Sequence, residues 1–308
     1  ADVRVENFRP GVLDRLGFST TRLHELNPRL VVLSITGFGH DGPEGRRPGY
    51  DQIAQGEAGL MSLTGPSAAE PTRVGVPIGD LLAGMNGAYG VVAALLERTT
   101  TGRGRVVRTS LLASIVGVHA FQGTRYTVAG EVPQPTGGHH PSICPYGLFH
   151  AADGFVQIAV GSEGLWRRFA PEFGLDRQEW ATNPERVGDR DAVIAAVDAA
   201  FRALPSTELL ARLDTLGVPA GKVRNLEEVY TWEQTRSQGL LIDVEHAALG
   251  TITLPGPPLR FDDTPGTGDG GDGVRSTHSA PPTLDQHGAD IRAWLAQPRQ
   301  PGDGERPT

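Results

Sequence analysis

The chain has 308 residues, 38% of them hydrophobic, and a formal net charge of -8. This length is enough for one large domain or two, and the apolar share is ordinary for a protein that buries a core. Acidic and basic residues are mixed along the chain, which argues against a nucleic-acid partner. Cys144 is the single cysteine, so no disulfide can form within the chain, and we expect a reducing, cytoplasmic environment.

No apolar run looks long enough to span a membrane, and no secretory signal pattern is visible, so we expect no membrane association. His139 and His140 are the one adjacent pair among nine histidines, and with a single cysteine no metal site of the usual kind is expected. The sequence begins at Ala1, without Met, directly in an expected strand. We therefore expect that the amino-terminal part of the first domain lies outside this chain.

The first half of the chain alternates strand and helix patterns, which predicts an α/β fold with a parallel sheet. Leu30–Thr36 is a run of leucine and β-branched residues typical of a buried parallel strand, and the glycine-rich loop Gly37–Gly49 follows it. The other expected elements are strands at Asp2–Glu6 and Val106–Thr109 and helices at Gly11–Leu16, Thr20–Asn27, Tyr50–Gly59, Ile78–Arg98 and Leu111–Val128.

The pattern changes near Glu131, where short strands in hairpins replace the strand–helix alternation. We expect a large, partial domain at 1–132, a smaller α+β domain at 133–246, and a return segment, flexible linker and terminal helix at 247–308. The expected elements are hairpins at Tyr146–His150 with Phe155–Val160 and at Leu240–Glu245 with Thr251–Leu254, helices at Ser162–Phe173, Asp189–Leu204, Ser206–Leu216, Leu226–Ser237 and Leu284–Ala296, the linker Asp262–Pro282 and a disordered tail Gln297–Thr308.

Asp80 is the strongest candidate for a catalytic residue in this sequence. It follows Pro77 and Gly79 at the start of a long expected helix. One interpretation is a helix N-cap, in which the carboxylate accepts hydrogen bonds from the first helix amides. The other is a nucleophile, because a carboxylate between glycines at a helix start is open to a bulky substrate, and nearby amides could stabilise an oxyanion. The residues alone leave both interpretations open.

The segment Gly137, Gly138, His139 and His140 is a second candidate. Paired glycines before two histidines favour a mobile loop that could close over a site. The alternative is a solvent-exposed turn between two domains. Local sequence does not decide between them.

A series of motifs in a fixed order resembles the class III CoA-transferase family, which contains formyl-CoA transferase and carnitine CoA-transferase. The resemblance covers about residues 1–260, and its strength lies in the order of many individually weak motifs. The motifs are Glu6-Asn7-Phe8-Arg9-Pro10-Gly11, Leu13-Asp14-Arg15-Leu16-Gly17, Asn27-Pro28-Arg29-Leu30, Gly37-Phe38-Gly39, Pro48-Gly49-Tyr50-Asp51-Gln52-Ile53-Ala54-Gln55, Ile78-Gly79-Asp80, Thr101-Gly102-Arg103-Gly104, His140-Pro141, Pro145-Tyr146, Ala152-Asp153-Gly154, Val218-Pro219-Ala220-Gly221 and Leu254-Pro255-Gly256.

The resemblance implies a Rossmann-like large domain with a parallel sheet, incomplete at its amino-terminal end, a smaller α+β domain, and two chains interlocked as a homodimer. It also implies a transferase that moves CoA between an acyl-CoA donor and a small carboxylic acid. Asp80 matches the family nucleophile, which carries an aspartyl-linked acyl intermediate. No permanently bound cofactor is implied, because the CoA thioester is itself a substrate.

Other positions carry over from the same resemblance. Gly137, Gly138, His139 and His140 match an active-site loop that keeps water from a hydrolysable anhydride. The positions that match the CoA-binding or active-site region are Asn7, Phe8, Arg9, Arg15, Tyr50 and Asp51. Arg15 is the best expected phosphate contact, since guanidinium pairs well with phosphate, although its plain alternative is an arginine on a helix surface.

Two other functions stay open. An α-methylacyl-CoA racemase shares this resemblance, but it needs an acid and a base on opposite faces of the α-carbon. The two family positions for that pair correspond to Met61-Ser62 and His139-His140 in this sequence, with no aspartate at the second. The other alternative is a truncated, inactive remnant or a module that only dimerises.

Overall fold

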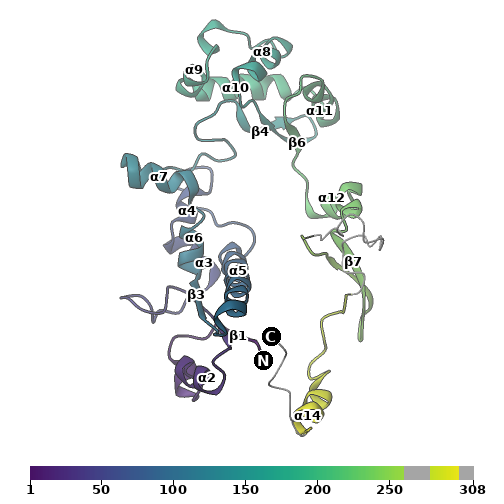
Figure 1. The fold of residues 1–308 in the computed structure, drawn as a ribbon. Helices are drawn as coiled ribbons and strands as arrows, with labels where there is room; N and C mark the ends of the chain where they lie inside the picture. The colour runs from purple at the N-terminus through teal and green to yellow at the C-terminus, as the bar shows by residue number, and fades with distance from the viewer. Residues whose placement is uncertain (260–277, 298–308) are drawn as a thin grey trace. The chain divides into compact units, whose positions relative to one another are not determined.

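The computed structural model describes residues 1–259 and 278–297 (Figure 1). The chain divides into two compact units, Ala1–Lys222 and Val223–Thr308. Most of the expected linker at 262–282 lies outside the described residues. The same holds for all but the first residue of the tail expected at 297–308.

The first unit begins with a parallel sheet of three strands in the order β1-β2-β3. The strands are β1 (Val3–Glu6), β2 (Val31–Thr36) and β3 (Val106–Ser110). In this register Leu33 of the central strand pairs with Val5 on one side and Val107 on the other. Five of the six β2 residues are buried, as expected for a leucine- and valine-rich central strand. The predicted α/β fold with a parallel sheet is confirmed.

Helices connect and cover these strands. They are α1 (Val12–Arg15), α2 (Thr20–Leu26), α3 (Asp51–Glu57), α4 (Leu60–Leu63), α5 (Ile78–Thr101), α6 (Leu111–Val116) and α7 (Ala120–Ala129). Helix α5 packs on β2 and β3. The approach is close because Gly87 has no side chain: a Cβ there would lie 2.8 Å from Leu33 Cδ2. The helix ends at Gly102, which adopts a left-handed φ of 66°.

The single helix predicted at Leu111–Val128 is wrong, because the chain breaks between α6 and α7. The His119 ring donates from Nε2 to the Ala58 carbonyl at 2.8 Å, a partner more than 60 residues away. The next residue, Ala120, has a φ of 49°, which is outside the right-handed helical region. A tertiary contact therefore overrides the local helical pattern.

The expectation that no apolar segment is long enough to span a membrane is wrong for helix α5. By length and composition alone it is long and apolar enough to cross one, the only such helix within residues 1–259 and 278–297. Its most apolar window is 22% buried. A core helix can pass the same test, so this single helix is a weak indication of membrane insertion.

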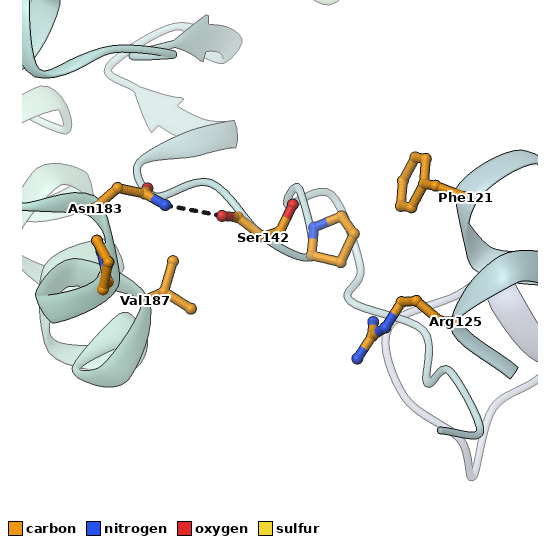
Figure 2. Close-up of a pocket in the computed structure, with 7 residues that line it drawn as sticks. Phe121, Arg125, Ser142, Asn183 and Val187 are labelled. Carbon is orange, nitrogen blue, oxygen red and sulfur yellow. Dashed lines mark hydrogen bonds between the residues drawn. The ribbon is translucent and has the colours of Figure 1, made fainter. Parts of the chain in front are cut away.

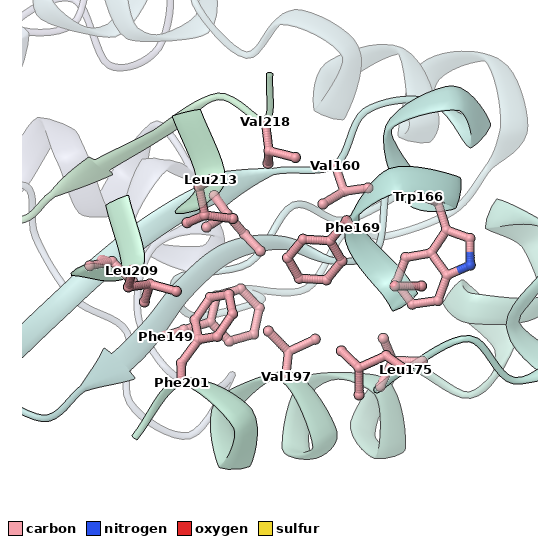
Figure 3. Packing of buried hydrophobic residues seen from close by; sticks show 14 of the residues in the cluster. Phe149, Val160, Trp166, Phe169, Leu175, Val197, Phe201, Leu209, Leu213 and Val218 are labelled. Carbon is pink, nitrogen blue, oxygen red and sulfur yellow. The ribbon is translucent and has the colours of Figure 1, made fainter. Parts of the chain in front are cut away.

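The first unit also holds an antiparallel sheet of three strands, β4-β5-β6, with its own core. The elements are β4 (Tyr146–Ala151), β5 (Gly154–Ala159), α8 (Glu163–Glu172), the 3-10 turn η1 (Gln178–Trp180), α9 (Asn183–Gly188), α10 (Arg190–Phe201), α11 (Ser206–Thr215) and β6 (Ala220–Lys222). Phe201 packs in this core beside Phe149, and its ring is edge-on to those of Phe149 and Phe169, with ring centroids 5.7 and 6.0 Å away (Figure 3). These T-shaped pairs are a favourable aromatic geometry.

The second unit consists of short elements. They are α12 (Leu226–Thr231), α13 (Glu233–Ser237), β7 (Leu241–His246), β8 (Gly250–Pro255) and α14 (Gly288–Ala296). The hairpin of β7 and β8 agrees with the sequence pattern. The single helix expected at 226–237 is wrong: Trp232 is extended, with ψ of 129°, and separates α12 from α13. The Arg224 guanidinium lies 3.9 Å from the Trp232 ring centroid, which helps to hold the break.

Candidate active site

The start of α5 lies at the carboxyl edge of the parallel sheet. The chain leaves β2 at this edge, returns through α5 and enters β3, so α5 runs opposite to the strands. Open parallel sheets bind ligands outside the carboxyl ends of their strands. Asp80, the third residue of α5, is therefore at the edge where a substrate is expected.

Asp80 is exposed, and its side chain makes no hydrogen bond within the described part of the chain. The N-cap position of α5 is Pro77, so the interpretation of Asp80 as the cap is wrong. Although the side chain reaches solvent, nearby protein atoms partly desolvate the carboxyl and raise its pKa, and the negative charge of Asp51 raises it further. The result is an unengaged carboxylate, which is what a nucleophile requires.

The amides at the start of α5 are bonded by other groups. Asp51 Oδ1 accepts a hydrogen bond from the Gly79 amide at 2.8 Å, and the Ile78 amide donates to the Val76 carbonyl at 2.8 Å. The amides of Ile78 and Gly79, which were candidates to stabilise an oxyanion, therefore already have hydrogen-bond partners. Asp51 is close enough to Asp80 for its charge to act on that carboxyl, while Tyr50, beside Asp51, is 78% exposed.

The other predicted CoA-binding residues follow β1, with Asn7, Phe8 and Arg9 directly after the carboxyl end of the strand and Arg15 at the end of α1. Asn7, Phe8, Arg9 and Arg15 are all exposed. Neither arginine forms an ion pair within residues 1–259 and 278–297. Guanidinium groups without an ion pair in the described part of the chain fit the binding of phosphate groups, which is the chemistry that CoA would need.

A partly buried polar cluster joins the last residue of β1 to β2 and the loop that follows β2, and the sequence interpretation missed it. Ser34 Oγ donates to Glu6, and His40 Nε2 lies 2.8 Å from Ser34 Oγ. Burial lowers the pKa of His40, and the charge of Arg108 lowers it further. The cluster holds the two loops that leave these strands. A serine within a largely apolar strand, beside a glutamate at the end of the neighbouring strand, was the available signal.

The glycine loop at 137–140 is anchored through its backbone. The Gly137 amide donates to the Gly65 carbonyl at 3.0 Å, and the Leu148 amide donates to the Gly138 carbonyl at 3.0 Å. Gly137 has a φ of 59°, which favours glycine at that position. The loop is thus tied both to the turn at 65 and to β4, and its mobility stays a prediction.

The two histidines of this loop are held by aromatic neighbours. His140 stacks between Phe121 and Tyr146, with ring centroids 5.9 and 5.0 Å away. His139 Nδ1 is buried and has no hydrogen-bond partner within the described residues. Burial lowers the pKa of both rings, and the nearby charge of Arg190 adds to the effect. Both imidazoles are therefore favoured in their neutral form near pH 7.

Not all predicted site residues come together. Within residues 1–259 and 278–297 no hydrogen bond or ion pair joins Asp80 to the loop at 137–140 or to Arg15. Asp51 is the one predicted site residue with a direct effect on Asp80. No group of three or more His, Cys, Asp or Glu residues in the described chain could hold a metal ion.

A mainly apolar cavity of about 500 Å³ lies beside the glycine loop (Figure 2). One wall comes from α7 and the other from α9, where Asn183 Nδ2 donates to the Ser142 carbonyl at 3.0 Å. Its lining residues are Phe121, Arg125, Pro141, Ser142, Asn183, Pro184 and Val187. None of the predicted catalytic or CoA-binding residues lines it, so the cavity and the α5 site are described separately.

Comparison with known proteins decides the family. The family model described as CoA-transferase family III matches residues 1–287. This chain belongs to CoA-transferase family III. It is 35% identical to succinate–glutarate CoA-transferase of Agrobacterium fabrum, over 96% of this chain and 72% of that protein. It is 32% identical to human succinyl-CoA:glutarate CoA-transferase, over 84% of this chain and 60% of that protein.

A solved structure supports the same assignment. The crystal structure of a CAIB/BAIF family protein from Brucella suis matches with a TM-score of 0.78 and 36% identity, covering 96% of this chain and 75% of that one. The family expected from the motifs and the CoA-transferase class of enzyme are thus confirmed. The chain spans less than two thirds of the human relative's length, so substrates, partners and residue roles are taken up as proposals.

Proposed function

We propose that this chain transfers CoA between an acyl-CoA and a small carboxylic acid through an acyl intermediate on Asp80. The observation that carries the proposal is the unengaged Asp80 carboxylate in the first turn of α5, at the carboxyl edge of a parallel sheet. The names of the two relatives favour dicarboxylic acids such as succinate and glutarate as acceptors.

The proposed reaction balances with one nucleophile. A carboxylate oxygen of Asp80 attacks the thioester carbonyl carbon, the C–S bond breaks, and an acyl anhydride and the CoA thiolate result. The thiolate then attacks the aspartyl carbonyl and releases the donor acid, which leaves an aspartyl-CoA thioester. The acceptor carboxylate displaces CoA from that thioester to form a second anhydride. Attack of the thiolate on the acceptor carbonyl gives the new acyl-CoA and regenerates Asp80.

Binding of CoA is proposed to use the residues after β1. Arg9 and Arg15 would pair with phosphate groups, which their lack of ion pairs in the described chain supports. Asn7 and the half-exposed Phe8 ring would contact the rest of the cofactor, and Tyr50 would line the reacting end. The loop at 137–140 would exclude water from the anhydride.

A homodimer is proposed as the working assembly. Helix α5 exposes a stripe of apolar side chains at helical spacing, Met85, Tyr89, Val92 and Leu96, each more than half exposed. Exposed apolar patches of this kind mark contact surfaces. The proposed compartment is the cytoplasm, which suits a chain whose single cysteine, Cys144, is a free thiol.

The deciding experiment traps the activated carbonyl of Asp80, from which hydroxylamine displaces the donor acid or CoA. The chain is incubated with succinyl-CoA and hydroxylamine, and peptide mass mapping is expected to find a hydroxamate on the peptide that contains Asp80. Exchange of the α-proton of an α-methylacyl-CoA with solvent deuterium, together with an unmodified Asp80, would instead establish the racemase. A chain that only dimerises would give neither signal and no heat on titration with CoA in a calorimeter.

A further inference from the structure

Two side chains of α3 form hydrogen bonds with the segment that leads into Asp80. Asp51 and Gln55 lie one helical turn apart, on the same face of the helix. Asp51 Oδ1 accepts from the Gly79 amide at 2.8 Å, and Asp51 Oδ2 accepts from Gln55 Nε2 at 2.7 Å. The two carboxylate oxygens therefore bind two different groups, one of them the residue directly before Asp80.

Gln55 forms further hydrogen bonds at the start of the same segment. Its Oε1 accepts from the Val74 amide at 2.8 Å, and its Nε2 also lies 3.4 Å from the Val76 carbonyl as a weak second donor contact. The Gln55 side chain is fully buried and cannot bond to water, so these protein groups supply its hydrogen-bond partners. Main-chain groups at 74, 76 and 79 are thereby connected to one helix through two side chains.

The close approach of Asp51 depends on the absence of a side chain at Gly79. A Cβ at Gly79 would lie 3.1 Å from Asp51 Oδ1 and 3.1 Å from Ile115 Cδ1. The glycine before Asp80 thus makes room for the carboxylate that fixes it. Sequence alone shows the glycine but not the partner that fills its place.

We infer that Asp51 and Gln55 are positioning residues that fix the backbone of the Asp80 nucleophile. This inference rests on the proposed function of Asp80 and assigns Asp51 a different role from the expected contact with CoA. Both oxygens of Asp51 are already engaged by protein groups, and Gln55 has no access to a ligand. Reaction rates depend steeply on such placement: a displacement of about 1 Å can cost about 10²-fold.

The hydrogen-bond pattern predicts a specific rescue. Gln55→Glu replaces the donor that faces Asp51 by an acceptor and sets two negative charges together. Asp51→Asn turns an acceptor into a donor that faces Gln55 Nε2. Each single substitution therefore breaks the contact between the two side chains. In the double variant the introduced amide can donate to the introduced carboxylate, and oxygens stay available for the Gly79 and Val74 amides, so only the weak contact with the Val76 carbonyl is not restored.

The test measures how fast Asp80 is acylated in a single turnover at saturating succinyl-CoA, with hydroxylamine as the trap and the full chain as the enzyme. Each single variant is expected to lose about 10²-fold in the acylation rate constant. The double variant is expected to return to within about 10-fold of the parent, with the dissociation constant for CoA unchanged throughout. The control is Gln52→Glu, an exposed position on the same helix with the same change in charge.

The outcomes distinguish a failure of this inference from a failure of the proposed function of Asp80. No adduct on Asp80 in the parent chain overturns the proposed function, and the positioning role falls with it. A parent adduct with unchanged rates in the single variants, or a folded double variant that stays slow, overturns the positioning role alone. If one single variant fails to fold, the other single variant and the double variant complete the same comparison.

Discussion

The two sheets of the first unit differ in the size of the apolar cluster formed by the elements around them. Around β4, β5 and β6, a single cluster gathers 17 buried residues, including Trp166 and Trp180. Around α3, α5 and α6 the buried cluster has five residues, and α5 leaves an apolar stripe exposed. The segment at 140–222 therefore has the larger apolar core. The smaller cluster lies in the part that bears the candidate nucleophile, where Asp80 and the apolar stripe of α5 are exposed.

This contrast predicts opposite responses to substitution. A change at the α5 start should affect chemistry more than stability, and a change in the β4–β6 core should do the reverse. Natural sites often show this separation, because reactive groups are held in environments that do not favour them.

The largest expected effect is that of Asp80→Ala on acyl transfer. Removal of a covalent nucleophile is expected to lower turnover by about 10³-fold or more. The free energy of unfolding should change by less than about 1 kcal/mol, because the carboxylate makes no hydrogen bond within the described residues. Its raised pKa means that the folded state disfavours the ionised form, so loss of the charge is not costly at neutral pH. Steady-state turnover and denaturant unfolding check this, and near-normal turnover would contradict it.

The next effect is that of Phe201→Ala on stability. The ring is fully buried and contacts Phe149, Phe169 and Phe173. Truncation of such a ring is expected to cost about 3–5 kcal/mol in the free energy of unfolding. Phe155→Ala, at a position that is 42% exposed on β5, is the matched control, with an expected cost below about 1 kcal/mol. Urea unfolding measures both, and equal costs would contradict the assignment of the core.

A third prediction concerns the exposed stripe of α5. Val92 is 66% exposed and lies between Tyr89 and Leu96, so Val92→Glu places a charge at the centre of the proposed contact. The dissociation constant of the homodimer is expected to rise at least about 10-fold, the effect of losing one important contact. Sedimentation velocity measures it. Leu249→Glu, at a position that is 69% exposed in the other unit, is the control, and identical sedimentation of the two variants would argue against this face.

The same contrast explains what the sequence could predict. The buried strand at 30–36 and the hairpin at 146–160 follow from local composition and period, so they were found close to their true bounds. The break at His119 and the third strand β6 depend on partners far along the chain, Ala58 and β5, which no local pattern shows. Gln55 was missed for the same reason, because its role lies in contacts with residues 19 and 21 positions away.

The smallest expected effect is a shift in pH dependence. Attack on the thioester requires an ionised Asp80, so the acylation rate falls as pH drops through the pKa of this carboxyl. Partial desolvation, and then the charge of Asp51, raise that pKa above the usual range for aspartate. The acid limb of the rate profile is therefore expected at higher pH than for an ordinary aspartate.

Asp51→Asn removes the charge and leaves the desolvation, so the acid limb should move part of the way to lower pH. The height of the rate profile then reports the placement of Asp80, and its midpoint reports the charge of Asp51. Misplacement of Asp80 lowers the rate at every pH, whereas loss of the Asp51 charge moves the midpoint. The hydroxamate yield per unit time, followed from neutral to acid pH in the parent chain and in the variant, separates the two. A midpoint that stays fixed, or moves to higher pH, would show that the charge of Asp51 does not act on the nucleophile.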